Sequence, residues 1–169
     1  MKWMLTALLA FCGTAFADYP VVPDPGMTTG VLCSRSDRDF DGLRYGEKIA
    51  YCHRNVDGRL KSRIYQEYGI PNKCRHRYTV DHFYPLSMGG NNSAKNLWPE
   101  HVLVKKLRFD LEQDTFDQLR EGRITQKQAL DIIREAKLHP PIAELNQWVE
   151  LMGGSDCDRA AVQAYLNLR

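Results

Sequence analysis

Apolar residues recur at helical spacing through much of this chain, and one strand-like run interrupts them. Leu60, Ile64 and Tyr68 lie four residues apart and are followed by a glycine and a proline, which predicts a helix over about residues 58–68. Residues 78–86 are rich in aromatic and β-branched side chains, which favours a strand.

The second half of the chain is helical in pattern. Apolar residues from Leu103 towards Leu119 predict one long helix that ends at Gly122. Thr125 and Gln128 have the spacing of a capping box, in which each side chain bonds to the other residue's backbone, and they predict the start of another helix.

Two shorter helices are expected near the end of the chain. Pro141 suits the first position of one helix, and Ser155 or Asp156 can cap the other. We find no internal repeat, low-complexity tract or domain boundary between residues 18 and 169. The chain is therefore predicted to be one helix-rich α+β domain with one short hairpin.

The first seventeen residues have the pattern of a signal peptide. Lys2 is followed by an apolar run up to Phe16, and Ala15-Phe16-Ala17 is a small-x-small cleavage site. The run is shorter than the about 20 apolar residues that cross a bilayer. We expect residues 1–17 to be removed and the mature protein to be exported, periplasmic or secreted, without a membrane contact. A buried helix is the alternative interpretation.

Four cysteines remain after the leader: Cys33, Cys52, Cys74 and Cys157. An even number of cysteines in an oxidising compartment suggests two disulfides, and the sequence leaves three pairings open. Zinc ligation is the alternative, although none of these cysteines belongs to a Cys-x-x-Cys pair.

The formal net charge of +2 does not by itself indicate a nucleic-acid-binding protein. The segment 44–77, however, holds nine basic residues against three acidic ones, with tyrosines between them. Such a segment could lie along phosphates, with Arg75 and Arg77 nearest to the strand-like run. A solvated helix surface is the common alternative for a run of charges.

The strand-like run carries an adjacent acid and imidazole, Asp81 and His82. An imidazole titrates near neutral pH and can take a proton from water, and a carboxylate can hold a divalent cation beside a phosphate. Because neighbouring side chains of a strand point to opposite faces, both can serve one site only where the strand twists or ends. These residue types are the ones that phosphodiester hydrolysis needs.

The residues on both sides of this pair resemble the HNH branch of the ββα-metal nucleases. In order, the chain carries Tyr68-Gly69-Ile70-Pro71, Asp81-His82, Pro85-Leu86, Gly89-Gly90 and Asn96-Leu97-Trp98-Pro99. The resemblance covers about forty residues, from Leu60 to His101. Exported bacterial endonucleases with disulfides are a second, looser resemblance. The family implies an HNH core over about residues 78–120, followed by C-terminal helices over about 125–169.

The resemblance also implies roles for individual residues. His82 is similar to the general base that activates water. Asp81 is similar to the first ligand of a divalent metal, most often Mg²⁺, with Mn²⁺ or Ca²⁺ as alternatives. Asn96 is similar to the asparagine that braces the hairpin and orients the base, and Gly89 and Gly90 suit the return between the strands. The competing interpretation is that His82 is a buried, hydrogen-bonded histidine and Asn96 a turn residue.

One position departs from the family pattern. The second metal ligand is expected eight or nine residues after the asparagine, where this chain has Val104 and Lys105. Neither side chain is a ligand that Mg²⁺ prefers. His101 is our predicted second ligand, although it could instead bond to backbone at a helix start. Asp110 or Glu112 could reach the ion in its place, or Asp81, water and the substrate phosphate could hold the ion alone.

Basic residues follow this position directly. Lys105, Lys106 and Arg108 would lie near the site and could hold phosphates or stabilise charge in the transition state, with ordinary solvation as the alternative. A weaker motif, Asp37-x-Asp39-x-Asp41-Gly42, resembles the opening of an EF-hand calcium loop. Its closing position holds Lys48 instead of glutamate, so an acidic turn is preferred.

The sequence therefore predicts an exported, disulfide-stabilised, metal-dependent endonuclease. Its substrate is expected to be nucleic acid, DNA before RNA, cut with little sequence preference because no base-reading module is visible. A nucleic-acid-binding protein that keeps the fold without cleavage is the alternative from another class. An antibacterial toxin nuclease would share the chemistry.

Overall fold

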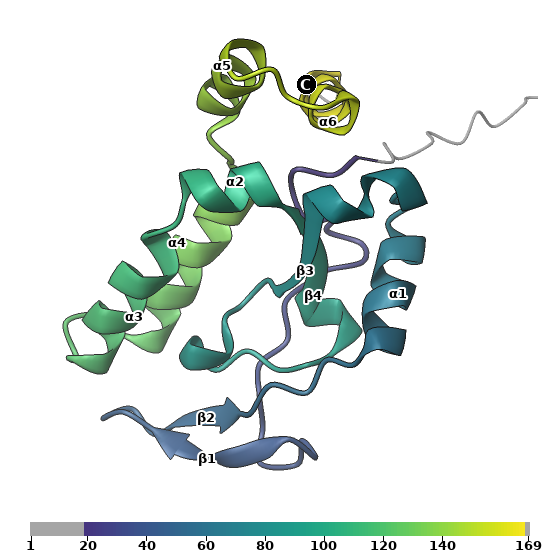
Figure 1. Cartoon of the computed structure of the whole chain (residues 1–169). Helices are drawn as coiled ribbons and strands as arrows, with labels where there is room; N and C mark the ends of the chain where they lie inside the picture. The colour runs from purple at the N-terminus through teal and green to yellow at the C-terminus, as the bar shows by residue number, and fades with distance from the viewer. Residues whose placement is uncertain (1–18, 168–169) are drawn as a thin grey trace, which may run out of the picture.

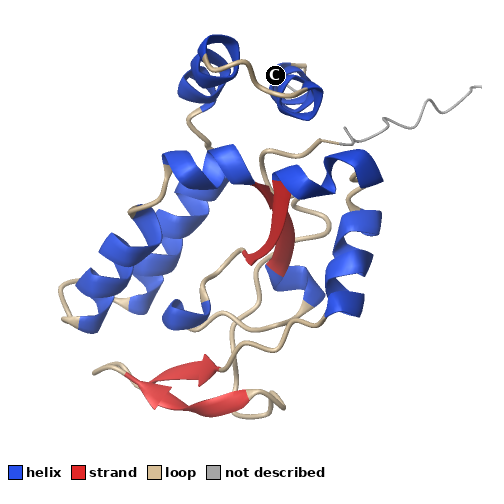
Figure 2. Ribbon diagram, viewed as in Figure 1, coloured by secondary structure: helices blue, strands red, loops and turns tan. Residues whose placement is uncertain are grey.

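The computed structural model describes residues 19–167, and Figure 1 shows how their helices and strands are arranged. The predicted signal peptide, residues 1–17, lies outside this part of the chain. Helices and two small two-stranded sheets make up an α+β fold, as Figure 2 shows by colour. None of the helices in the described part is both long and apolar enough to cross a bilayer.

The central hairpin pairs β3 (Tyr78–His82) with β4 (Leu97–His101) in antiparallel register. Asp81 lies opposite Trp98, and His82 lies opposite Leu97, so both residues stand at the end of the pairing. The predicted strand over 78–86 is thus shorter in the structure, because a 3₁₀ turn at Leu86–Met88 follows it. The Trp98-Pro99 pair lies inside β4.

Helix α1 (Gly58–Glu67) is the helix predicted over about residues 58–68 from its apolar spacing, and it covers one side of this hairpin. Asp57 caps the helix by accepting the Leu60 backbone N–H at 2.8 Å, which satisfies one of the donors that a helix start leaves unpaired. Ile64 is buried and packs with Val80, Trp98 and other apolar residues of the hairpin. This packing fixes the strand that carries Asp81 and His82.

On the other side of the hairpin lie α2 (Val102–Leu107), α3 (Leu111–Arg120) and α4 (Gln126–Leu138). The prediction of one helix from 103 to 119 is wrong, because a turn at residues 108–110 separates α2 from α3. The Arg108 guanidinium turns inwards there and donates to the Ala136 carbonyl. The capping box at the start of α4 is confirmed, with Thr125 accepting the Gln128 N–H at 3.3 Å.

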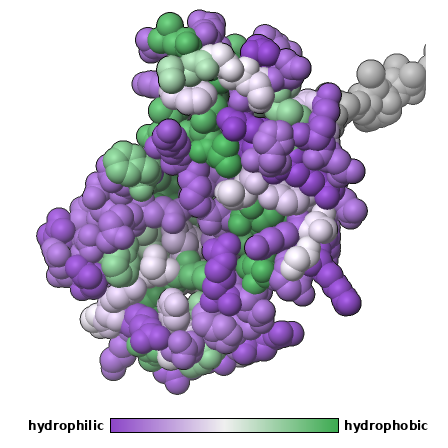
Figure 3. Space-filling model, viewed as in Figure 1, coloured by the Kyte–Doolittle hydropathy of each residue, from purple (hydrophilic) through white to green (hydrophobic). Residues whose placement is uncertain are grey.

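The last two helices, α5 (Ile142–Leu151) and α6 (Asp156–Leu166), form a pair at the end of the molecule beyond α2 (Figure 1). Ser155 is the cap of α6. Their apolar faces pack with Leu103 and Val104 of α2. On the face seen in Figure 3 hydrophilic residues predominate, and apolar side chains reach the surface where α5 lies above α2.

A second hairpin, β1 (Phe40–Arg44) with β2 (Ile49–Cys52), was not predicted. The two disulfides that the cysteine count suggested are present as Cys33–Cys52 and Cys74–Cys157. The first joins the N-terminal segment to β2, and the second joins the 3₁₀ turn before β3 to α6. Both fit a protein that matures in an oxidising compartment.

Candidate active site

The loop between β3 and β4 is held by Asn96, which is fully buried. Its Oδ1 accepts the Tyr84 N–H at 2.9 Å, and its Nδ2 donates to the Tyr84 carbonyl at 3.0 Å and the Asn91 carbonyl at 2.9 Å. Asn96 therefore braces the backbone two residues after His82, without touching the imidazole itself. These bonds fit the bracing part of the role that the resemblance implies for Asn96, and its part in catalysis stays a prediction.

Two glycines allow the same loop to turn. Gly89 has φ +91°, a left-handed conformation that favours glycine. A Cβ atom on Gly90 would lie 1.8 Å from the Tyr84 carbonyl oxygen, so only glycine fits there. The close approach brings the loop back towards the end of β3, where Asn92 contacts His82.

The His82 imidazole is held by Asn92, whose Oδ1 lies 3.1 Å from Nε2. The orientation of the Asn92 amide is set by its other bonds, because its Nδ2 donates to Asp39 Oδ2 at 3.0 Å and to the His53 carbonyl at 2.9 Å. Oδ1 therefore faces His82 as an acceptor, and Nε2 must carry a proton. In the neutral ring this leaves Nδ1 as the basic nitrogen.

The surroundings of His82 also favour its neutral form. The residue is 3% exposed, and burial lowers its pKa below the ordinary 6.5 of histidine. The nearby guanidinium of Arg54 acts in the same direction, while Asn92 and Asp81 oppose it. A neutral imidazole at neutral pH is the form that can accept a proton.

Asp81 points to the other face of the hairpin, towards α2 and α4. Its Oδ1 accepts the His82 N–H at 2.8 Å, and its Oδ2 accepts a hydrogen bond from Lys105 Nζ. Burial alone would raise the pKa of this carboxyl, but the positive charges of Lys137 and Lys105 lower it well below its usual range. Asp81 is therefore a carboxylate at any physiological pH.

A second carboxyl, Glu100, shares this face with Asp81, because strand partners and alternate residues of a hairpin lie on one side. It is 2% exposed and accepts from Arg108 Nη2 at 2.5 Å. Lys105 Nζ lies 3.9 Å from its Oε2, so one ammonium contacts both acids. Burial raises the pKa of Glu100 to about 7 despite the cations around it.

Lys137 of α4 is the third cation of this charged cluster, after Lys105 and Arg108. It is 1% exposed and donates to the His82 carbonyl at 2.7 Å and to Glu112 Oε1 at 2.7 Å. It links the end of β3 to α4 and balances part of the negative charge of Asp81. The sequence carried a signal for this residue, because Lys137 continues the buried stripe of Ala129 and Ile133 at four-residue spacing.

The cluster opens on a hollow of about 330 Å³ between α2, the turn to α3 and α4. Glu100, Lys105, Arg108 and Lys137 line it, so basic side chains outnumber acidic ones at its wall. The predicted phosphate contacts Lys105 and Arg108 are thus brought to the site. Asp81 and His82 do not line the hollow themselves; it borders the charged cluster through Glu100, Lys105 and Lys137.

His101, the predicted second metal ligand, lies elsewhere. Its Nδ1 accepts the Leu103 N–H at 3.3 Å, and its Nε2 lies 3.0 Å from Asp158 Oδ1. The ring is fully buried against Tyr78, on the opposite face of the hairpin from Asp81. The prediction of His101 as a ligand is therefore corrected: the residue caps α2 and joins β4 to α6.

The two upstream arginines are also engaged in the fold. Arg77 donates to Asp158 Oδ1 at 2.7 Å, beside His101. Arg75 stacks its guanidinium over the Tyr65 ring at 5.5 Å from the centroid. The structure does not bring either of them to Asp81 or His82, so the predicted basic track does not run into the site through these residues.

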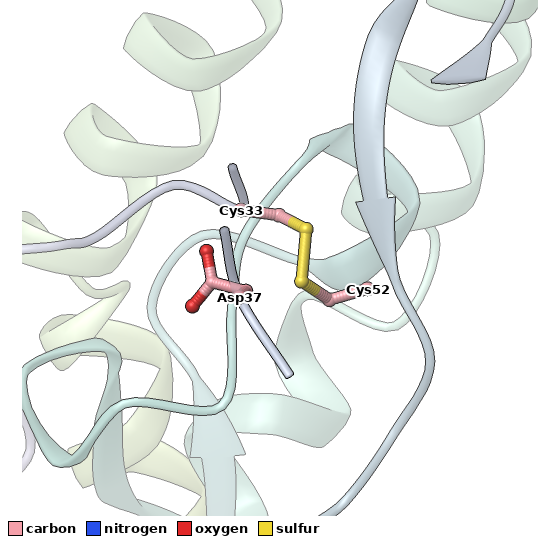
Figure 4. A group of neighbouring side chains, drawn as sticks. All are labelled: Cys33, Asp37 and Cys52. Carbon is pink, nitrogen blue, oxygen red and sulfur yellow. A yellow bond between two sulfur atoms is a disulfide. The ribbon is translucent and has the colours of Figure 1, made fainter. Parts of the chain in front are cut away.

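One further group of possible metal ligands is found in the described part of the chain: Cys33, Asp37 and Cys52 (Figure 4). The two cysteines share a disulfide, so neither sulfur is available as a thiolate. The carboxylate of Asp37 accepts the Ser34 N–H at 2.6 Å. The disulfide and this hydrogen bond hold the turn at residues 33–37 against β2.

The possible calcium loop is an acidic turn. Asp37 bonds to Ser34, Asp39 to Asn55 and Asn92, and Asp41 to Arg44. The three carboxylates serve different partners instead of converging on one point, which agrees with the preferred interpretation.

Comparison of the chain with protein-family models, with curated proteins and with solved structures finds no match.

Proposed function

We propose that this protein is an exported, metal-dependent endonuclease of the HNH type, which hydrolyses phosphodiester bonds of nucleic acid, DNA before RNA. One observation carries the proposal. At the end of a buried strand, an ionised carboxylate (Asp81) adjoins a neutral imidazole (His82) whose proton is held on Nε2 by Asn92. The sequence resemblance and the basic hollow beside Asp81 support it.

In this proposal His82 is the general base. Nδ1 takes a proton from water as the water oxygen forms a bond to phosphorus, and one phosphorus–oxygen ester bond breaks. Asn92 keeps the ring in the required tautomer, and Asn96 holds the loop on which the ring depends. Lys105 and Arg108 would stabilise the charge that develops on the phosphate.

The side chains at Asp81 fit a divalent cation. Mg²⁺ prefers oxygen ligands, keeps several of its waters and binds through one or two carboxylates together with substrate phosphate. Asp81 and Glu100 supply two carboxylates that a single ammonium already contacts, and the Lys105 side chain is 49% exposed and can swing away. The ion, when bound, would polarise the phosphate and stabilise the leaving oxygen.

The contact between Lys105 and Asp81 also favours a second candidate function, nucleic-acid binding without cleavage. Lys105 satisfies the carboxylate without a metal, at a position where the family places a ligand. The test is incubation of the purified mature protein with supercoiled plasmid in Mg²⁺, Mn²⁺ or Ca²⁺, with and without EDTA. Metal-dependent nicking supports the nuclease, and retarded but intact plasmid in all three metals supports the binding protein.

A further inference from the structure

A single aromatic side chain stands at the rim of the basic hollow. Phe109 lies in the turn between α2 and α3 and is 77% exposed, more than any other large apolar residue of the described chain. Isolated apolar residues are common on protein surfaces and usually need no explanation. Phe109 differs because of what surrounds it.

Phe109 separates two hollows. On one side lies the hollow at Glu100 and Lys105. On the other side lies a hollow of about 500 Å³, which is lined by Leu103, Lys106, Leu107, Phe109 and Trp148. Lys106 and Phe109 belong to both walls, so the two spaces adjoin. The second volume lies within the range of about 300–1,000 Å³ that is usual for small-ligand sites.

The walls of the second hollow have a distinct composition. Two aromatic rings and two leucines surround one exposed lysine, and Lys106 makes no ion pair within residues 19–167. A flat apolar group that carries a negative charge would suit such walls. A nucleotide has both parts, since its base has an aromatic face and its phosphate an anionic charge.

We propose, resting on the nuclease function above, that Phe109 and Trp148 receive an unpaired base of the substrate strand while the neighbouring phosphate lies in the hollow at Lys105. Lys106, which belongs to the walls of both hollows, contacts this phosphate from the side of the base. A base inside a duplex is stacked between its neighbours and offers no free face to a protein ring, so the site selects single-stranded or locally unpaired nucleic acid. A purely apolar protein partner would gain nothing from Lys106.

The test measures binding in EDTA, where no cleavage is expected, with a fluorescent single strand of about 12 nucleotides, within the span that such grooves bind, and the blunt duplex of the same sequence. Phe109→Ala is expected to weaken binding of the single strand by roughly 5- to 100-fold and to leave duplex binding unchanged. Phe109→Tyr should restore it. Leu151→Ala is the matched control, because Leu151 is 74% exposed on α5 and lines neither hollow.

A second readout reports stacking directly. A strand with 2-aminopurine should lose fluorescence on binding the wild-type protein and lose less on binding Phe109→Ala. Three results would overturn the proposal. Phe109→Ala could bind the single strand as tightly as wild type, it could lose the same affinity for single strand and duplex, or the wild-type protein could fail to bind the single strand. Because these measurements need no hydrolysis, failed nicking of plasmid by the wild type contradicts the nuclease function separately.

Discussion

His82 and Asn92 form a hydrogen bond in which the asparagine oxygen lies 3.1 Å from Nε2 of the imidazole. The amide cannot turn over without losing its two donor bonds to Asp39 and the His53 carbonyl. The relationship therefore fixes which nitrogen of His82 is protonated, and it ties the strand end to the segment that precedes α1. A general base that relies on Nδ1 depends on this contact.

The pH dependence of cleavage should report this environment. The base must be neutral, and the pKa of His82 is lowered, so kcat/KM should rise with pH and level off with an apparent pKa below 6.5. Asn92→Asp places a negative charge beside the Nε2–H of His82 and stabilises the imidazolium. The acidic limb of the pH–rate profile should therefore move to higher pH. Asn55→Asp adds the same charge to the neighbouring side chain, which does not bond to the ring. An identical shift in both variants would contradict a specific role for Asn92.

Lys105 should compete with metal for Asp81. Its ammonium contacts both carboxylates of the candidate ion site, so Lys105→Met removes a competing cation and should tighten binding of Mn²⁺ by about tenfold or more. Isothermal titration calorimetry without nucleic acid measures this directly. Lys106→Met is the control, because it removes an equal charge one residue away. If both variants bind Mn²⁺ with the same affinity as wild type, Asp81 and Glu100 are not the ligands.

The two disulfides should contribute unequally to stability. Cross-links act mainly by restricting the unfolded chain, so the loop of 83 residues closed by Cys74–Cys157 should matter more than the loop of 19 closed by Cys33–Cys52. The chain-entropy relation gives about 4.5 kcal/mol against about 3 kcal/mol. Urea unfolding of Cys74→Ser/Cys157→Ser and Cys33→Ser/Cys52→Ser compares them. An equal or reversed order would argue against the entropic account.

Acid should destabilise the fold through His101. Burial lowers the pKa of this histidine to about 4 from 6.5, although Asp158 opposes the shift. Folding therefore favours the neutral form of His101. Its contribution to the free energy of unfolding is fully present above pH 6.5 and is lost as the pH falls towards 4. The loss is on the order of 3 kcal/mol.

The measurement is the free energy of unfolding at about pH 7 and about pH 4, on either side of this titration. His101→Gln should lose less stability between the two values than wild type does. His139→Gln is the control, because His139 is exposed at the end of α4. A wild-type difference between the two pH values that survives intact in His101→Gln would show that other groups cause the acid sensitivity.

The elements that the sequence predicted correctly are those with local signals. Helix α1 and the start of α4 follow from apolar spacing and from side-chain caps within four residues. The β1–β2 hairpin was not predicted, because its turn has positive φ at Tyr45 and Lys48 and not at Gly46, the one glycine between the two strands. At the break after α2, the Arg108 guanidinium donates to the Ala136 carbonyl, a partner remote in sequence that the local pattern cannot indicate.

The residues of the candidate site also divide into those with a local sequence signal and those placed by contacts remote in sequence. Asp81, His82 and Asn96 could be found because they lie within sixteen residues of one another in a recognisable order. Asn92, Glu100 and Lys137 acquire their roles only when the hairpin, the loop and α4 meet. His101 was misplaced because its position near the expected ligand says nothing about Asp158, which lies 57 residues further along.

The most direct test of the account is plasmid nicking by His82→Ala and His82→Gln, at saturating Mg²⁺ or Mn²⁺. Loss of the general base should lower the rate by about 100-fold or more. Circular dichroism should match the wild type, and His139→Ala should nick normally. His82→Gln keeps an amide donor for Asn92, so a loss of activity there cannot be assigned to a collapsed loop. Nicking by both folded His82 variants at the wild-type rate would contradict the assignment of His82 as the base.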